Sequence, residues 1–175
     1  MKTIINGKFI LPDEHGNFFM TAEKILTFGE KIISFDTAAE EIIDAQGNFV
    51  APGFINIHIH GCNGFDTMDE NIFALEEMSK FLPSTGVTSF LPTTMTMPRS
   101  RIITALENIR NAKVSGAKII GANLEGPFIN EKFCGAQDKN CITRADFNFV
   151  NEFSDVIKIV TVAPELLDDF TFIDN

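Results

Sequence analysis

The rhythm of hydrophobic and polar positions changes near residue 50. Before that point, short apolar runs alternate with turn-forming residues, in the segments TIINGKFIL, FFM, KILTF, KIISF and EIIDAQGNFV. Such runs are typical of strands, and residues 28–31 and 46–48 are expected to form tight turns between them. The pattern predicts a small antiparallel unit over residues 1–51, half of a β-sandwich and too thin to be stable alone.

From Pro52 onward, strand-like stretches alternate with stretches of helical periodicity. Strands are predicted over residues 53–60, 86–94, 117–125 and 156–165, and helices over residues 69–82, 101–114 and 146–153. The order β-α-β-α-β-α-β predicts a parallel α/β sheet over residues 52–175.

Apolar stripes and capping residues support the three helices. The first helix is expected to begin at an Asp69 N-cap, and a capping box over Thr143–Asp146 is expected to open the third. The expected inward positions of the first two helices are Ile72, Leu75, Met78 and Leu82, and Ile102, Leu106 and Ile109.

The number of strands leaves two architectures open. Four β/α units are half of a (β/α)₈ barrel, which needs roughly 250 residues. A chain of 175 residues is therefore either an open four-stranded α/β domain or the front part of something longer.

Composition narrows the classes of function. The formal net charge of −10 argues against nucleic-acid binding, because an acidic surface repels phosphate backbones. The chain has three cysteines without zinc-finger spacing, which favours free thiols in a reducing compartment. No apolar run approaches membrane-spanning length and the start lacks a signal-peptide core, so we expect a cytoplasmic protein without membrane contact.

Candidate chemistry starts with the stretch PGFINIHIHGCNGFD, which holds two of the three histidines. Side chains alternate along a strand, so Asn56, His58 and His60 share one face and the isoleucines between them share the other, where helices can cover them. The two imidazoles then lie about 7 Å apart along the strand, near its carboxyl end. Lining of a polar strand face is one interpretation; binding of zinc or another first-row metal is the one that the pairing favours.

Glu125 ends the predicted strand AKIIGANLE, at the same end of the sheet. A carboxylate at the end of a buried strand is costly unless it is paired or binds a metal, although a capped, solvated position at a loop edge is the alternative. We favour metal binding together with the two histidines.

Other polar residues give weaker signals. Thr93 and Thr94 follow the second strand and either line a pocket or form a turn, and Glu165 is either pocket lining or a helix N-terminal acid. Asp66 and Asp69 are expected to be turn and cap residues, and His15 is expected to be exposed and without a role.

With these residues in place, the chain resembles the amidohydrolase superfamily and, within it, the N-acetylglucosamine-6-phosphate deacetylase family. The resemblance rests on the blocks VAPGFINIHIHGCNGFD, GVTSFLPTTMT, GANLEGPFINEKFCGAQD and VTVAPE. The H-x-H pair alone is weakly specific, whereas LEGPF followed by GAQ points to this family much more narrowly. The resemblance implies the first half of a (β/α)₈ metal-dependent hydrolase barrel after a small β-sandwich segment.

The resemblance also implies the reaction and the roles of residues. The reaction is the metal-dependent removal of acetate from N-acetylglucosamine 6-phosphate, with the metal polarising the acetamide carbonyl and activating water. His58, His60 and Glu125 match metal ligands, for one or two divalent ions, with zinc first among the candidates and iron or others as alternatives. Ala136 and Gln137 match a pair that contacts the substrate. Gln137 departs from the family's common histidine, and an amide cannot titrate.

The resemblance further implies what these 175 residues lack. The chain has no histidine after His60, and Asp168, Asp169 and Asp174 come too early to match the family's acid/base aspartate. That aspartate, two more histidine ligands and most phosphate-binding residues are expected after Asn175, and the full-length form is expected to be a homodimer. A non-catalytic remnant, an assembly subunit of an amidohydrolase and a cyclic-amide hydrolase are the alternatives.

Overall fold

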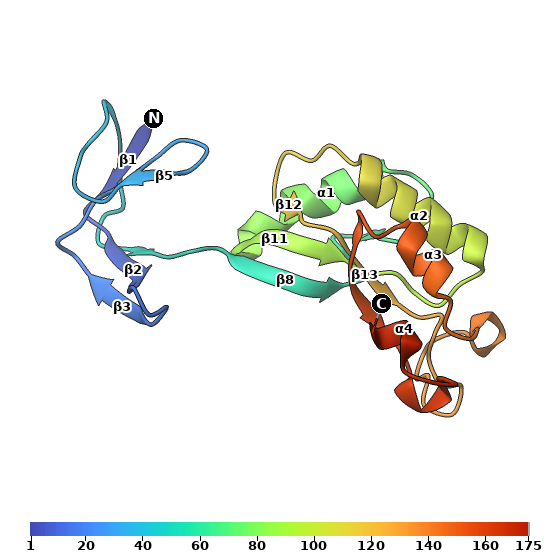
Figure 1. Ribbon diagram of the computed structural model, residues 1–175. Coiled ribbons are helices and arrows are strands. Elements are labelled where there is room, and N and C mark those ends of the chain that lie inside the picture. The colour runs from blue at the N-terminus through green and yellow to red at the C-terminus, as the bar shows by residue number, and fades with distance from the viewer. Residues whose placement is uncertain (175) are drawn as a thin grey trace. The chain divides into compact units, whose positions relative to one another are not determined.

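The computed structural model describes residues 1–174 and divides into two compact units, Met1–Pro52 and Gly53 onward (Figure 1). Each unit has its own sheets and is described by itself.

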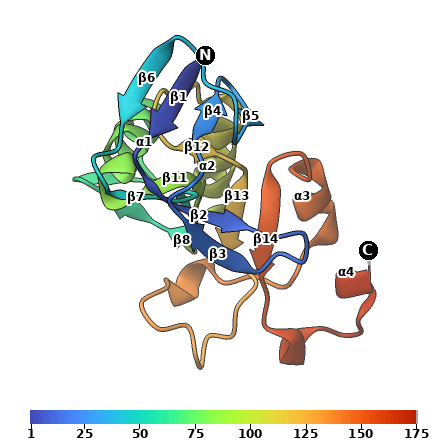
Figure 2. The same ribbon diagram turned by 90° about the vertical axis from the view of Figure 1, so that its left-hand side faces the viewer.

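The first unit contains two small sheets (Figure 2). One has the order β5-β4-β1-β6, built from β5 (Ile32–Ser34), β4 (Leu26–Phe28), β1 (Lys2–Ile5) and β6 (Glu41–Asp44). The other has the order β3-β2-β7, built from β3 (Phe18–Thr21), β2 (Lys8–Pro12) and β7 (Phe49–Val50).

The pairing within this unit corrects the prediction of a purely antiparallel arrangement. The pairs β1–β4, β4–β5 and β2–β3 are antiparallel, but β1–β6 and β2–β7 are parallel. Both parallel pairs join strands far apart in sequence, which leaves room for the long connection that parallel pairing requires. The run TIINGKFIL is also two strands in different sheets, because the chain turns at Asn6, where φ is +55°.

The second unit alternates strands and helices, as predicted for a parallel α/β protein. Its strands are β8 (Phe54–Ile59), β9 (Gly61–Cys62), β10 (Phe65–Asp66), β11 (Val87–Pro92), β12 (Lys118–Ile119), β13 (Ala122–Glu125) and β14 (Ile157–Thr161). Its α-helices are α1 (Phe73–Phe81), α2 (Arg99–Asn111), α3 (Phe147–Glu152) and α4 (Thr171–Asp174), with 3₁₀ turns at Leu82–Thr85, Lys139–Cys141 and Pro164–Leu166.

Parallel pairing joins β8 to β11, β11 to β12, and β13 to β14. The predicted single strand over residues 117–125 is wrong in one respect: it breaks at Gly121, whose φ of +138° belongs to no regular strand. Its first piece, β12, therefore pairs with β11, and its second piece, β13, pairs with β14. An isolated parallel bridge between Thr93 and Asn123 links the two sheets.

The main core lies between the strands β11 and β13 and the helices α1, α2 and α3, and α1 and α2 lie on one side of β11 (Figure 1). Buried side chains come from α1, from α2 at Ile102, Leu106 and Ile109 as predicted, and from the strands at Phe90 and Leu124. The stripe expected on α1 is buried at Leu75, Met78 and Leu82 but exposed at Ile72.

The capping of two helices differs from the prediction. Helix α1 begins at Phe73, not at Asp69, because the carboxylate of Asp69 accepts the N–H of Asp66 in the preceding turn. Helix α3 is capped by Asp146, whose side chain accepts the N–H of Phe149, while the N–H of Thr143 donates to the carbonyl of Pro127. Local side-chain hydrogen bonds thus set where each helix begins.

The isoleucine face of β8 was expected to pack against helices, and this is wrong for Ile55 and Ile57. Their exposed fractions are 62% and 55%, and Phe54 is exposed as well. The reason is topological: β8 is an edge strand of the order β12-β11-β8, and none of the described helices covers these side chains. Among the described residues, no helix combines the length and the apolar character needed to cross a membrane.

Candidate metal centre

Two histidines meet at the carboxyl end of β8. His58 lies in the strand and His60 follows its last residue, so both side chains project from the same face. Their rings are edge to face, with centroids 5.1 Å apart, and the two Nε2 atoms are 3.3 Å apart. The N–H of His58 donates to Oδ1 of Asn56, two residues earlier on that face.

Glu125, the last residue of β13, directs its carboxylate to the same point. Its Oε2 is 2.9 Å from Nε2 of His58 and 3.0 Å from Nε2 of His60. A tetrahedral zinc ion with bonds of about 2.0–2.1 Å holds its ligand atoms roughly 3.4 Å apart. The three side chains therefore form a group of the size and chemistry that a first-row metal ion requires.

The hydrogen bonds around the site also suit a cation. The backbone carbonyl of Thr93 can only accept, so the 3.1 Å contact from Nδ1 of His60 places the proton on Nδ1 and leaves the Nε2 lone pair for a ligand. Oε2 of Glu125 is buried and accepts no hydrogen bond from the described residues, although both rings lie close. A divalent cation would satisfy these lone pairs together.

The residues with an expected substrate role lie in the loop after β13. Ala136 is exposed and Gln137 is half-buried. Oε1 of Gln137 accepts the N–H of Thr96 at 2.6 Å, and its Nε2 lies 3.7 Å from Sδ of Met95. The Gln137 amide therefore joins the loops that follow β11 and β13, and only its N–H side can reach another partner.

Gly126 allows these two loops to approach each other. Its φ is +72°, and a Cβ built there would collide with the side chain of Thr96. Since Gly126 directly follows Glu125, the glycine lets the chain turn sharply at the carboxylate.

The weaker candidates have different surroundings. Thr93 and Thr94 are fully buried, Asp66 accepts the N–H of Met68 in a turn, and His15 is exposed in its loop. Oε1 of Glu165 accepts a hydrogen bond from Asn130, which lowers the pKa of Glu165. The three cysteines are free thiols, and burial raises the pKa of Cys62.

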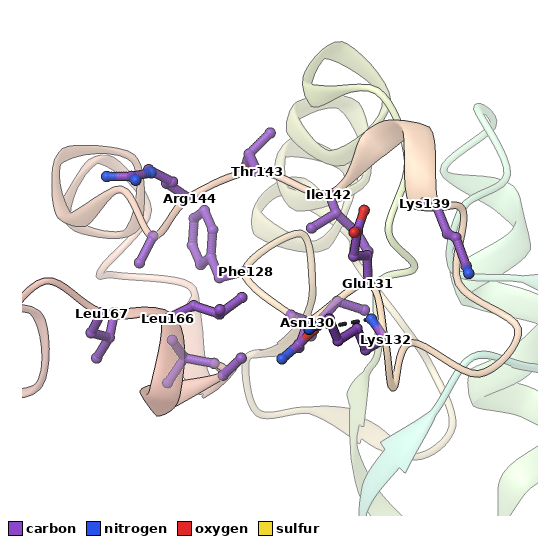
Figure 3. A pocket seen from close by; sticks show the side chains of 14 residues that line it. Phe128, Asn130, Glu131, Lys132, Lys139, Ile142, Thr143, Arg144, Leu166 and Leu167 are labelled. Atoms are coloured by element: carbon purple, nitrogen blue, oxygen red, sulfur yellow. Dashed lines mark hydrogen bonds between the residues drawn. The ribbon is translucent and has the colours of Figure 1, made fainter.

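Hollows of this unit lie beside the loops that follow the strands. One of about 530 Å³ is lined by residues from the loops after β13 and β14, and Figure 3 shows Phe128, Leu166 and Leu167 on one side and Lys132 and Lys139 on the other. The three candidate ligands are not among its described lining residues. Another hollow, of about 400 Å³, is lined by Ala136 together with Asp66 and Thr96.

One further residue of the site, Asn123, was not singled out by the sequence pattern, and Thr93 was given two alternatives, pocket lining or a turn. Asn123 is buried two residues before Glu125, and its Nδ2 donates to the carbonyl of Ile57 at 2.9 Å. The hydroxyl of Thr93 accepts the N–H of Ile59 at 2.9 Å. Period-two alternation places Asn123 on the face of Glu125, which is the signal that could have identified it.

The second unit is a parallel α/β arrangement that gathers two histidines and a carboxylate at the carboxyl ends of its strands, and the chain is similar in fold to solved N-acetylglucosamine-6-phosphate deacetylases. The structure of N-acetylglucosamine-6-phosphate deacetylase from Pasteurella multocida matches with a TM-score of 0.80 and 26% identity, covering 94% of this chain and 45% of that one. No protein-family model matches the chain.

Curated proteins identify the relatives more narrowly. N-acetylglucosamine-6-phosphate deacetylase from Bacillus subtilis is 42% identical over 137 residues, which cover 73% of this chain and 35% of the relative. The Mus musculus protein of the same name is 34% identical over 180 residues, covering 93% of this chain and 42% of the relative. The chain is thus a homologue of the N-acetylglucosamine-6-phosphate deacetylases, a family of hydrolases, and spans less than half of their length.

Proposed function

We propose that this chain carries the first part of the active site of a metal-dependent N-acetylglucosamine-6-phosphate deacetylase. The reaction removes the acetyl group of N-acetylglucosamine 6-phosphate by hydrolysis and gives glucosamine 6-phosphate and acetate. The observation that carries the proposal is the convergence of His58, His60 and Glu125 on one point. The names of the relatives supply the substrate.

In this proposal His58, His60 and Glu125 hold a divalent ion, with zinc as the first candidate because two imidazoles and one carboxylate suit it. When bound, the ion supplies a Lewis acid for the acetamide carbonyl and activates water. Thr93 keeps the proton of His60 on Nδ1 through its carbonyl. Ala136 and Gln137 face the substrate from the loop after β13, where Gln137 can offer one N–H to a sugar hydroxyl.

The same proposal covers the architecture. Residues 52–175 would form the first half of a (β/α)₈ barrel, and residues 1–51 would belong to a small β-sandwich. The parallel strands, the open edge of β8 and the exposed Ile55 and Ile57 support this, because a closed barrel would cover that edge. The acid/base aspartate, the remaining ligands and most phosphate contacts would come from residues outside this sequence, in a homodimeric full-length protein.

The exposed edge also favours a second candidate. A subunit that presents Phe54, Ile55 and Ile57 on a strand with one open edge is suited to bind another chain that completes the barrel. Such a non-catalytic assembly subunit would hold the metal without turning over the sugar phosphate.

An acetate-release assay with N-acetylglucosamine 6-phosphate separates these proposals. We expect no turnover by the 175 residues alone, with or without zinc, because the acid/base group is missing. We expect turnover by a chimera in which this chain replaces the matching part of the Bacillus subtilis enzyme, and its loss in the same chimera carrying His58→Asn and His60→Asn.

Turnover by the 175 residues alone at a rate near that of the intact relative would contradict the proposal that essential groups lie outside them. A folded, zinc-loaded chimera without activity would favour the assembly subunit.

A further inference from the structure

The strand beside the histidines contains a proline in an unusual place. Pro92 ends β11, which lies between β12 and β8, and it is the register partner of Ile59. Proline has no N–H and is normally confined to sheet edges and bulges. The ladder between β8 and β11 is accordingly irregular between Phe90 and Pro92.

Two buried side chains take over hydrogen bonds of β8 at this irregularity. Nδ2 of Asn123 donates to the carbonyl of Ile57 at 2.9 Å, and Oγ1 of Thr93 accepts the N–H of Ile59, also at 2.9 Å. Asn123 is 3% exposed and Thr93 is fully buried, so water does not replace either contact. Both are side-chain contacts in positions where a regular sheet would use backbone groups.

These two contacts flank His58 directly. Ile57 precedes it and Ile59 follows it, and the carbonyl of Thr93 also accepts the Nδ1 proton of His60. On the other side, Asn123 lies two residues before Glu125 on the same strand face. One network thus connects the strand that carries the histidines with the strand that carries the carboxylate.

We propose that Asn123 and Thr93 are positioning residues. They fix the position of β8 relative to β13, and therefore the distances from His58 and His60 to Glu125 that metal binding requires. The inference rests on the proposed metal centre. Strands β8 and β13 belong to different sheets, and the other edge of β8 has no strand partner among the described residues. The hydrogen bond from the Asn123 amide to Ile57 therefore connects β13 directly with β8.

This hydrogen bond matters because metal binding tolerates only small changes in the distances between ligand atoms. Metal–ligand distances vary by only about 0.2 Å between functional sites, and removal of an outer hydrogen-bond partner typically costs 10–100-fold in metal affinity. Loss of the Asn123 amide or the Thr93 hydroxyl leaves a β8 group without its partner, so β8 can shift against Glu125.

The test measures zinc affinity of the 175-residue chain by competition with a chromophoric chelator, together with the cobalt(II) absorption spectrum. We expect Asn123→Ala and Thr93→Val to weaken zinc binding about 10–100-fold and to change the cobalt spectrum. Thr93→Ser keeps the hydroxyl and should retain affinity close to that of the unmodified chain.

Ser79→Ala is the matched control for loss of a buried hydrogen bond. Ser79 is fully buried, its hydroxyl donates to the carbonyl of Ala117 at 2.8 Å, and it makes no hydrogen bond with His58, His60 or Glu125. We expect this variant to lose thermal stability while zinc affinity and the cobalt spectrum stay unchanged.

The possible results test the metal centre and the positioning role of Asn123 and Thr93 separately. If the unmodified chain binds no zinc, or if His58→Asn/His60→Asn binds it equally well, the metal centre itself is wrong. If the unmodified chain binds zinc through these histidines and Thr93→Val matches it in affinity and spectrum, the positioning role is overturned. The Thr93→Val and Thr93→Ser pair decides this even where Asn123→Ala does not fold.

Discussion

The two units of this chain use the same alternation of apolar and polar positions with very different results. In the second unit, the helices α1, α2 and α3 and the strands bury one continuous apolar cluster. In the first unit, Phe9 is the one large apolar side chain among the described residues that is fully buried, and most others on its strands are exposed. The exposed ones include Phe18, Phe19, Met20, Ile32, Ile33, Ile42, Ile43 and Phe49.

The difference shows what an alternating pattern can and cannot specify. Alternation determines which residues share a face of a strand, but burial depends on a second layer that covers that face. The second unit brings its own covering helices, whereas the small sheets of the first unit carry apolar side chains that no helix of that unit covers. The edge of β8 repeats the same situation within the second unit.

The largest expected difference in unfolding free energy is between the truncation of a buried phenylalanine in the second unit and that of an exposed one in the first. Phe90→Ala, in β11, removes a fully buried ring and should lower the free energy of unfolding by about 3–5 kcal/mol. Phe19→Ala, in β3, removes a ring that is 47% exposed and should change it by about 0.5 kcal/mol or less. Urea denaturation followed by circular dichroism measures both. Equal losses would contradict the contrast between the units.

The next effect compares two glycines with positive φ. Gly126→Ala adds a Cβ that collides with Thr96 beside Glu125, and we expect a cost of about 1–3 kcal/mol together with weaker zinc binding. Gly16→Ala, in the first unit, has φ +82° but meets no atom within 4 Å, so only the backbone cost of about 1 kcal/mol remains. Thermal denaturation and zinc titration of both variants check this. Zinc affinity that falls equally in both would argue against a local role of Gly126.

A smaller effect concerns the cap of α3. Asp146→Ala removes the side-chain acceptor for the N–H of Phe149 and should cost about 1 kcal/mol at neutral pH. The hydrogen bond from Arg99, and then that from Phe149, lower the pKa of Asp146. A lowered folded pKa gives stability that is present above the unfolded pKa, near 3.9, and is lost as the pH falls through the folded value.

Unfolding curves from pH 7 to pH 3 therefore test the cap. The difference in stability between the unmodified chain and Asp146→Ala should shrink below about pH 4, where the unfolded state takes up protons more readily. A difference that stays constant over this range would show that the charge of Asp146 does not contribute.

The smallest effect on folding stability is expected at the exposed apolar surface of the first unit. Ile33→Lys replaces a side chain that is 56% exposed, so the free energy of unfolding should change by about 0.5 kcal/mol or less. Self-association should fall, because an exposed apolar strand residue favours contact between molecules. Light scattering measures this, and the exposed Lys31→Arg serves as the control.

Much of the second unit could be predicted from local pattern. The parallel α/β order and the buried face of α2 followed from periodicity, and these predictions are confirmed. The prediction that His58, His60 and Glu125 lie near each other needed only strand alternation and the rule that parallel strands end at one edge. Their role as metal ligands remains a prediction.

The remaining features depended on contacts between distant residues. The break at Gly121 and the parallel pairs in the first unit arise from which strands meet, which periodicity does not encode. The start of α1 was misjudged because Asp69 accepts the N–H of Asp66 instead of capping the helix. The Asn123 contact with Ile57 spans 66 residues and follows from no local signal.

The central claim is that His58, His60 and Glu125 bind one metal ion together, and zinc stoichiometry tests it most directly. Elemental analysis after dialysis should give one zinc per chain for the unmodified protein and for His15→Asn, which removes the exposed third histidine as a matched control. His58→Asn/His60→Asn and Glu125→Gln should lose most of this zinc, because each removes ligand atoms from the common point. Unchanged stoichiometry in the double histidine variant would contradict the account.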